Sequence, residues 1–223
     1  MRGLIIALAC IVMSGGARAG CPTVTGVAPV SVSSYVNVTV LMDGSPVEGA
    51  VLEGFRQPKN YEAEFTLVTD ARGTAATPKL SQGLYVISAL TAEGKIGELL
   101  LSVKAASNTT SIPFDLDKGT WNQFKRTPED TQSIAQFYGT VADAVGAAER
   151  GGVIAVYEVN SANKKPIAIL HPDRNAHFSA NLKDGSYLVT FYANDALPVV
   201  VLIRVSGEGD KKALAIKLGM RMC

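Results

Sequence analysis

The stretch TDARGTAATPKLSQGLYVISAL at residues 69–90 decides the fold, because HPDRNAHFSANLKDGSYLVTFY at residues 171–192 repeats its pattern 102 positions later. The register continues without a gap to residues 116 and 218. Identical residues occupy these pairs of positions: Arg72 and Arg174, Leu80 and Leu182, Gly83 and Gly185, Tyr85 and Tyr187, Val103 and Val205, and Leu116 and Leu218. We therefore predict two copies of one domain of about 100 residues, a common domain size.

Each copy has the pattern of a β-sandwich. In residues 35–40 valines alternate with polar residues, the period of two expected for a strand with one buried face. Further short runs follow at about 48–55, 62–69, 74–78, 84–91, 96–104 and 108–116, with turn residues between them. Short strands at this spacing, without a long helical period, favour a seven-stranded Greek-key sandwich. The repeated Leu-x-x-Gly-x-Tyr predicts a buried tyrosine whose hydroxyl bonds nearby backbone.

Three segments of the first copy resemble a known family: VLMDGSPVEGAV (residues 40–51), TDARG (residues 69–73) and LSQGLYV (residues 80–86). They are similar to the carboxypeptidase regulatory-like, prealbumin-type (transthyretin-like) sandwich, to which collagen-adhesin B-type repeats are related. The resemblance implies an all-β chain of two tandem prealbumin-like sandwiches, used as spacers, adhesin stalks or appendages to enzymes. These motifs are structural, so they identify a fold and not an activity.

The resemblance is weaker in the second copy. There Asp143–Gly146 replaces the Asp-Gly-x-Pro turn, and Pro172–Asn175 replaces the Asp-x-x-Gly turn. Some adhesin-type repeats carry a Lys–Asn cross-link that starts from a lysine in the first strand. Neither residues 35–41 nor residues 137–143 contain a lysine, so we expect no such cross-link.

The first residues predict an export signal. Arg2 supplies a positive start, Leu4–Met13 is apolar, and Ala17-Arg18-Ala19 is an A-x-A cleavage site. The apolar run is shorter than the roughly 20 residues that span a bilayer. We therefore expect an exported chain, whether periplasmic, extracellular or at the cell surface, after removal of residues 1–19.

The rest of the chain divides into five expected segments: an N-terminal segment (20–34), a first sandwich (35–116), a connector (117–136), a second sandwich (137–218) and a C-terminal tail (219–223). In the connector Thr127 can cap a helix, Pro128 suits its first position, and Glu129 and Asp130 favour its positive end. We predict a short helix at about 128–135. Trp121 is expected to pack on a domain face, with sugar stacking as the alternative.

Two cysteines remain after the signal is removed, Cys21 and Cys223. In an oxidising compartment they suggest an intrachain disulfide. Lipidation of Cys21 is one alternative, although Arg18 stands where a lipobox has an aliphatic residue. Free or intermolecular thiols are the other.

Charge limits the partners. Without residues 1–19 the formal net charge is near −1, because the signal contains two arginines and no acidic residue. This balance argues against binding of nucleic acid or of an anionic membrane. The expected partners are protein or polysaccharide surfaces, with self-association as a further option.

The densest group of reactive side chains lies at residues 171–177. His171, Asp173 and His177 could bind zinc or copper. A further strong ligand is not evident, and the matching turn of the first copy has no such ligands. We expect a solvated turn and no cofactor. Asp115 and Asp117 fall well short of the six to eight oxygen ligands that calcium takes.

Enzymatic signatures are weak. Hydroxyisourate hydrolases use a related sandwich, but their Tyr-Arg-Gly-Ser-type tail is not found in Gly219–Cys223. Intradiol dioxygenases need two tyrosines and two closely spaced histidines as iron ligands, which this chain does not match. A Gly-x-Ser-x-Gly elbow is also missing from the sequence. We expect that the protein is not an enzyme.

The sequence favours a secreted, non-catalytic structural or binding protein, such as a subunit of a surface assembly or an adhesin-like module. One alternative is a metal- or small-ligand-binding protein that uses His171 and His177, and another is an accessory module of a secreted enzyme system. The candidate contact residues are aromatic and cationic side chains of the loops and the connector: Phe55, Arg56, Tyr61, Trp121 and Tyr157.

Overall fold

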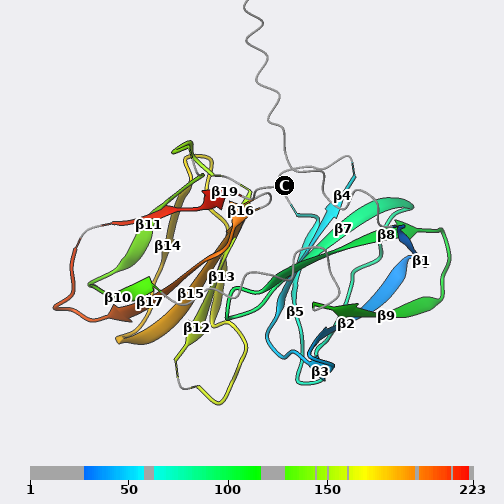
Figure 1. Ribbon diagram of the computed structural model, residues 1–223, viewed down its shortest axis with the longest axis horizontal. Helices are drawn as coiled ribbons and strands as arrows, with labels where there is room; N and C mark the ends of the chain where they lie inside the picture. Colours follow the sequence, from blue (N-terminus) through cyan, green and yellow to red (C-terminus); the bar gives the residue numbers. More distant parts are fainter. Residues whose placement is uncertain are drawn as a thin grey trace, which may run out of the picture.

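The computed structural model describes residues 28–57, 63–116, 129–143, 145–149, 151–159, 161–193, 196–211 and 213–220. Within these ranges every regular element is a β-strand, and the strands form two β-sandwiches that lie side by side (Figure 1). The predicted all-β class is confirmed. None of the described segments forms a helix that is long and apolar enough to cross a membrane.

The first sandwich consists of two sheets. One has the order β1 (Val30–Val32), β8 (Ile96–Val103), β7 (Gly83–Leu90), β4 (Val51–Arg56) and β5 (Phe65–Val68). The other has the order β3 (Ser45–Pro46), β2 (Tyr35–Met42) and β6 (Thr74–Ala76), with β9 (Thr109–Asp115) paired in parallel to β2. The seven runs read from the sequence coincide with β2, β4, β5, β6, β7, β8 and β9.

The second sandwich repeats this plan. Its larger sheet has the order β10 (Glu129–Ile134), β17 (Val199–Val205), β15 (Gly185–Ala193), β12 (Gly152–Glu158) and β13 (Ala168–Leu170). The facing sheet contains β14 (His177–Ala180), β11 (Phe137–Ala142) and β18 (Leu214–Lys217). A separate pair joins β16 (Ala196–Leu197) to β19 (Gly219–Met220).

The repeated tyrosines occupy equivalent buried places. Tyr85 is opposite Leu101 and Tyr187 is opposite Ile203, each inside the core of its own sandwich. The Tyr187 hydroxyl donates to the backbone carbonyl of Lys183 at 2.8 Å, as expected, whereas the Tyr85 hydroxyl donates to a carboxylate, that of Glu64, at 3.1 Å. Burial raises the pKa of both phenols.

The predicted helix at 128–135 is wrong, because β10 occupies Glu129–Ile134 and pairs in parallel with β17. β1 pairs with β8 in the same way, so that Ile134 lies opposite Val205 as Val32 lies opposite Val103. Capping signals are local and weak, and the unpaired backbone groups of a sheet edge can override them. The expected N-terminal segment and connector therefore each contribute a strand to a sandwich.

The gap-free register also needs a local correction. Val40 donates to the carbonyl of Gly73, and its counterpart Val141 donates to the carbonyl of Ala176. Equivalent residues of the two copies are therefore 101 positions apart in the first strand and 103 positions apart in the Asp turn, instead of 102. Because of this offset, Arg174 is not the structural equivalent of Arg72 despite their identity.

Candidate functional site

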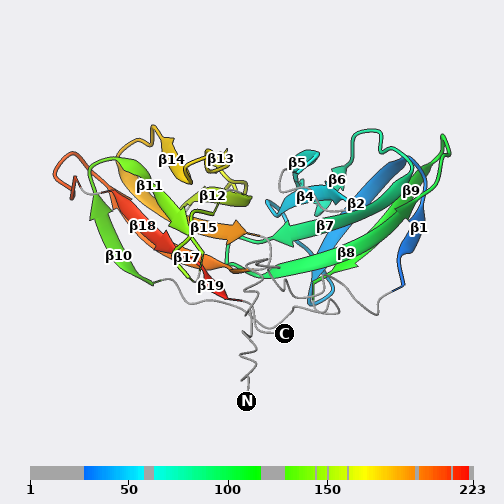
Figure 2. The same cartoon turned by 90° about the horizontal axis from the view of Figure 1, so that it is seen from above.

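The two sandwiches meet through the outer faces of their larger sheets. Alternation along β4 places Leu52 in the core of the first sandwich and Val51 on the opposite face. That opposite face is also buried, because it packs against β12 and β15 of the second sandwich. The residues of this shared cluster are Val51, Leu90, Ile96, Val153, Ala155, Tyr157 and Tyr192. Figure 2 shows that the C-terminal ends of β7 and β15 both run toward this junction.

Hydrogen bonds cross the junction. The Tyr157 hydroxyl donates to the carbonyl of Gly49 at 3.1 Å. The Thr190 hydroxyl donates to the carbonyl of Ala92 at 2.9 Å. The two sandwiches are therefore held by directional contacts as well as by apolar burial.

A row of polar side chains crosses the first sheet at the junction. Glu53 lies opposite Ser88 on β7, and Ser88 lies opposite Glu98 on β8. All three are buried, with exposed fractions of 3%, 3% and 4%. Buried carboxyl groups need partners, and the second sandwich supplies some: the Tyr192 hydroxyl donates to Glu98 at 3.3 Å, and His171 Nδ1 lies 3.7 Å from Glu53.

The backbones approach closely beside this row. Gly49 has a φ of +76°, and a Cβ added there would lie 2.1 Å from the carbonyl oxygen of Lys164. Gly94 has a φ of +75°, and its Cβ would lie 2.5 Å from a methyl group of Val200. Only glycine meets both the conformation and the space at these two points.

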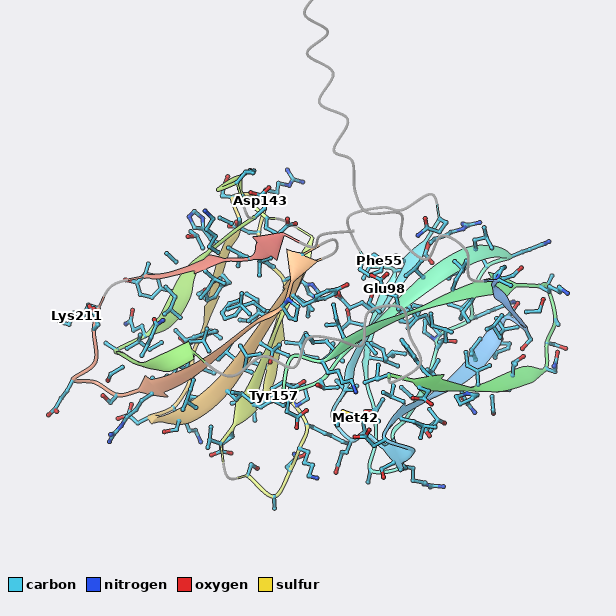
Figure 3. All side chains as sticks on the ribbon, in the orientation of Figure 1. Met42, Phe55, Glu98, Asp143, Tyr157 and Lys211 are labelled. Atoms are coloured by element: carbon cyan, nitrogen blue, oxygen red, sulfur yellow. The ribbon has the colours of Figure 1, made fainter. Side chains whose placement is uncertain are left out.

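A groove of about 500 Å³ opens between the sandwiches next to Tyr157. It is lined by the segment from β2 to β4, by the turn from β7 to β8, by the end of β12 with the segment that follows it, and by one residue each of β15 and β17. Its lining residues are Met42, Ser45, Pro46, Val47, Glu48, Thr91, Ala92, Glu93, Tyr157, Glu158, Val159, Ser161, Asn163, Lys164, Leu188 and Leu202. In Figure 3, Met42 and Tyr157 mark the two sides of this region.

The charge of the lining is predominantly negative. Glu48, Glu93 and Glu158 contribute three carboxylates, against the single ammonium group of Lys164. Among the described residues none of these three carboxylates makes a hydrogen bond or an ion pair. Burial raises the pKa of the Tyr157 phenol far above its usual range, and the nearby charge of Glu93 adds to the shift.

Two of the contact residues expected from the sequence need correction. Phe55 is 2% exposed and Tyr157 is 5% exposed, so neither ring presents a face to an outside partner. The loop argument failed because both residues belong to strands, Phe55 to β4 and Tyr157 to β12. The face of β12 that carries Tyr157 packs against the first sandwich. Arg56 is exposed, and its guanidinium donates to the carbonyl of Gln82 at 3.1 Å. Other predicted residues lie outside the described ranges: Tyr61, Trp121, Cys21 and Cys223.

The histidine turn does not bring its side chains to one point. His171 Nδ1 lies 3.2 Å from the carbonyl of Gly152 at the junction, whereas His177 Nδ1 lies 3.8 Å from Asp173. The Asp173 carboxylate accepts from the backbone amides of His177 and Asn175, and these bonds lower its pKa. In the part of the chain that the structure describes, no three metal-binding side chains gather.

Comparison with known proteins leaves the family open. No family model matches the chain, and no curated protein matches it. Several solved structures show some likeness. The Bacillus anthracis TIE protein is 10% identical over 84% of this chain and 34% of that one, with a TM-score of 0.32. BcpA, the major pilin subunit of Bacillus cereus, is 11% identical over 84% of this chain and 99% of that one, with a TM-score of 0.32.

The third likeness is to the Klebsiella pneumoniae 5-hydroxyisourate hydrolase. It is 20% identical over 37% of this chain and 88% of that one, with a TM-score of 0.29. Hydroxyisourate hydrolases are the enzymes whose sandwich is related to the prealbumin-type domain that the sequence resembles. At such low TM-scores none of the three likenesses supports an argument about function, and this chain spans about one third of the length of the TIE protein.

Proposed function

We propose that this chain is an exported, non-catalytic structural and binding protein in which two β-sandwiches act as one rigid unit. The junction carries the proposal. Both larger sheets bury their outer faces there, and hydrogen bonds from Tyr157 and Thr190 tie the halves together. Domains of one chain are expected to move relative to each other unless their interface is large and hydrophobic. If these two sandwiches moved freely, the outer faces of their larger sheets would be exposed to water.

A rigid unit of this kind suits a subunit of a cell-surface or extracellular assembly that contacts protein or polysaccharide. The export signal at residues 1–19 and the Cys21–Cys223 disulfide remain part of this proposal. The small-ligand alternative gains support from the groove and none from the histidines, which face separate partners.

Rigidity can be measured by pulsed electron paramagnetic resonance. Spin labels at Arg72→Cys and Arg174→Cys would place one label on an exposed turn of each sandwich. We expect a single narrow distance distribution. A thiol titration of the unsubstituted mature chain comes first, because it tests the Cys21–Cys223 bond and shows whether these cysteines must be replaced by serine.

Export is tested on intact cells. We expect a membrane-impermeant biotin reagent to label the protein, and we expect the recovered chain to begin at Gly20. A broad distance distribution would overturn the rigid unit, and an unprocessed chain confined to the cytosol would overturn export.

A further inference from the structure

We propose that the groove between the sandwiches binds a small organic cation, an amine carried on an apolar chain or ring. This inference goes beyond the structural role, because the groove could bind such a ligand whether or not the protein joins an assembly. It rests on three properties of the groove: its size, its apolar walls and the excess of carboxylates over ammonium groups among its described lining residues.

The size and the walls fit a small molecule. A volume of about 500 Å³ lies within the range of roughly 300–1,000 Å³ that is common for ligand sites. Apolar side chains come from both halves, with Pro46 and Val47 from the first sandwich and Leu188 and Leu202 from the second. The walls are set by the junction, so the groove is preformed and a ligand would lose little affinity to reorganisation of the protein.

The carboxylates select the charge of the ligand. Glu48 and Glu93 belong to the first sandwich, and Glu158 to the second. Among the described residues no cation pairs with them, so an ammonium group in the groove would complement their charge. An anion of the same shape would be repelled, because like charges brought together are unfavourable.

The volume favours a free small molecule over a side chain of a partner protein. A lysine side chain that entered from outside would fill only part of the groove, and the apolar walls would remain exposed to water. An aryl-alkyl amine covers the walls and places its ammonium group at the carboxylates in one molecule. A cationic partner protein is therefore an outcome of the test and not the occupant that we propose.

The test titrates the mature chain, residues 20–223, with 4-phenylbutylamine by isothermal calorimetry. The comparison ligand is 4-phenylbutyrate, which has the same ring and the same number of chain carbons but carries the opposite charge. We expect saturable one-to-one binding of the amine, weakened by added salt because exposed charges are screened, and no saturable binding of the acid.

Variants locate the site. Each of Glu93→Gln and Glu158→Gln should weaken amine binding by up to about fivefold, since an exposed charge pair is worth at most about 1 kcal/mol. The double variant should weaken it roughly tenfold, if the two effects add. Glu208→Gln removes an exposed carboxylate from the turn after β17 and should change nothing. Leu202→Trp should fill the groove and abolish binding, with circular dichroism showing that the fold is retained.

Several results would overturn the proposal: no saturable binding of the amine, equal binding of amine and acid, or undiminished amine binding in the double variant. Binding of the peptide acetyl-Ala-Lys-Ala-amide without binding of the free amine would also overturn it, in favour of a protein partner. None of these results would affect the rigid unit, which the spin-label distances test separately.

Discussion

The two sandwiches repeat one plan but present different chemistry to each other. At the junction the first sandwich carries Glu53, Ser88 and Glu98, whereas the equivalent positions of the second are Ala155, Thr190 and Val200. The contact between Tyr192 and Glu98 is likewise one-way, because Leu90 stands at the place of Tyr192 in the first copy. The halves are therefore complementary and not interchangeable. A pair of identical halves would bury unpaired carboxyl groups or lose their partners.

The strongest way to break this complementarity is to separate the halves at Gly49. We expect Gly49→Ala to destabilise the protein by about 2–5 kcal/mol, because the new methyl group adds overpacking against the carbonyl of Lys164 to the strain of a positive φ. The measurement is urea unfolding followed by tryptophan fluorescence and circular dichroism.

Gly44→Ala is the matched control for Gly49→Ala. Gly44 has a similar φ of +73°, but a Cβ there would meet nothing within 4 Å. Its cost should be about 1 kcal/mol, the conformational part alone. Equal losses in the two variants would mean that the close approach at Gly49 contributes nothing.

The next two variants compare the hydrogen bond from Tyr192 to the Glu98 carboxylate with the hydrogen bond from Tyr157 to the backbone carbonyl of Gly49. We expect Tyr192→Phe to cost about 2 kcal/mol, since it leaves the buried Glu98 carboxyl group without that donor, and Tyr157→Phe to cost about 1 kcal/mol. Urea unfolding measures both. In a Glu98→Gln background the cost of Tyr192→Phe should shrink, and an unchanged cost would show that the two side chains are not coupled.

The smallest effect on stability is expected from substitutions in the Asp turn, which both copies contain. Gly73 has a φ of +70°, and Ala176 takes its place in the second copy with a φ of +61°. We expect Ala176→Gly to stabilise the protein by about 0.5 kcal/mol, because relief of left-handed strain exceeds the entropy that glycine adds to the unfolded chain. Thermal unfolding detects the shift, and a lower melting temperature would contradict it. Gly73→Ala should be destabilising, since its Cβ would lie 2.7 Å from the carbonyl of Val40.

The strands could be predicted because their signals are local. Alternating apolar residues mark β2, and the Gly-x-Tyr turns mark the starts of β7 and β15. β10 could not be found in this way, because residues 129–134 carry a polar sequence that forms a strand only by pairing with the edge of β17. Its position opposite β17 matches that of β1 opposite β8, and this match is visible only in three dimensions.

The sequence contains a signal for the junction, which the search for alternating apolar residues did not use. Residues 85–90, YVISAL, and residues 152–157, GVIAVY, are nearly continuous apolar runs. Such runs are typical of strands that are buried on both faces. They show that a second face is covered, but they do not show by what. The groove could not be predicted, because its walls come from segments that only the packing of the two halves brings together.

The distance along the chain between the partners at the junction has a consequence for the order of folding. Tyr157 bonds a residue 108 positions earlier, and Tyr192 bonds one 94 positions earlier. A chain that emerges from its N-terminus would complete the first sandwich while the strands that cover Val51, Leu90 and Ile96 are still unmade. During that interval an apolar face is exposed and prone to aggregate. The second sandwich therefore protects this face of the first only after its own strands have been synthesised and folded.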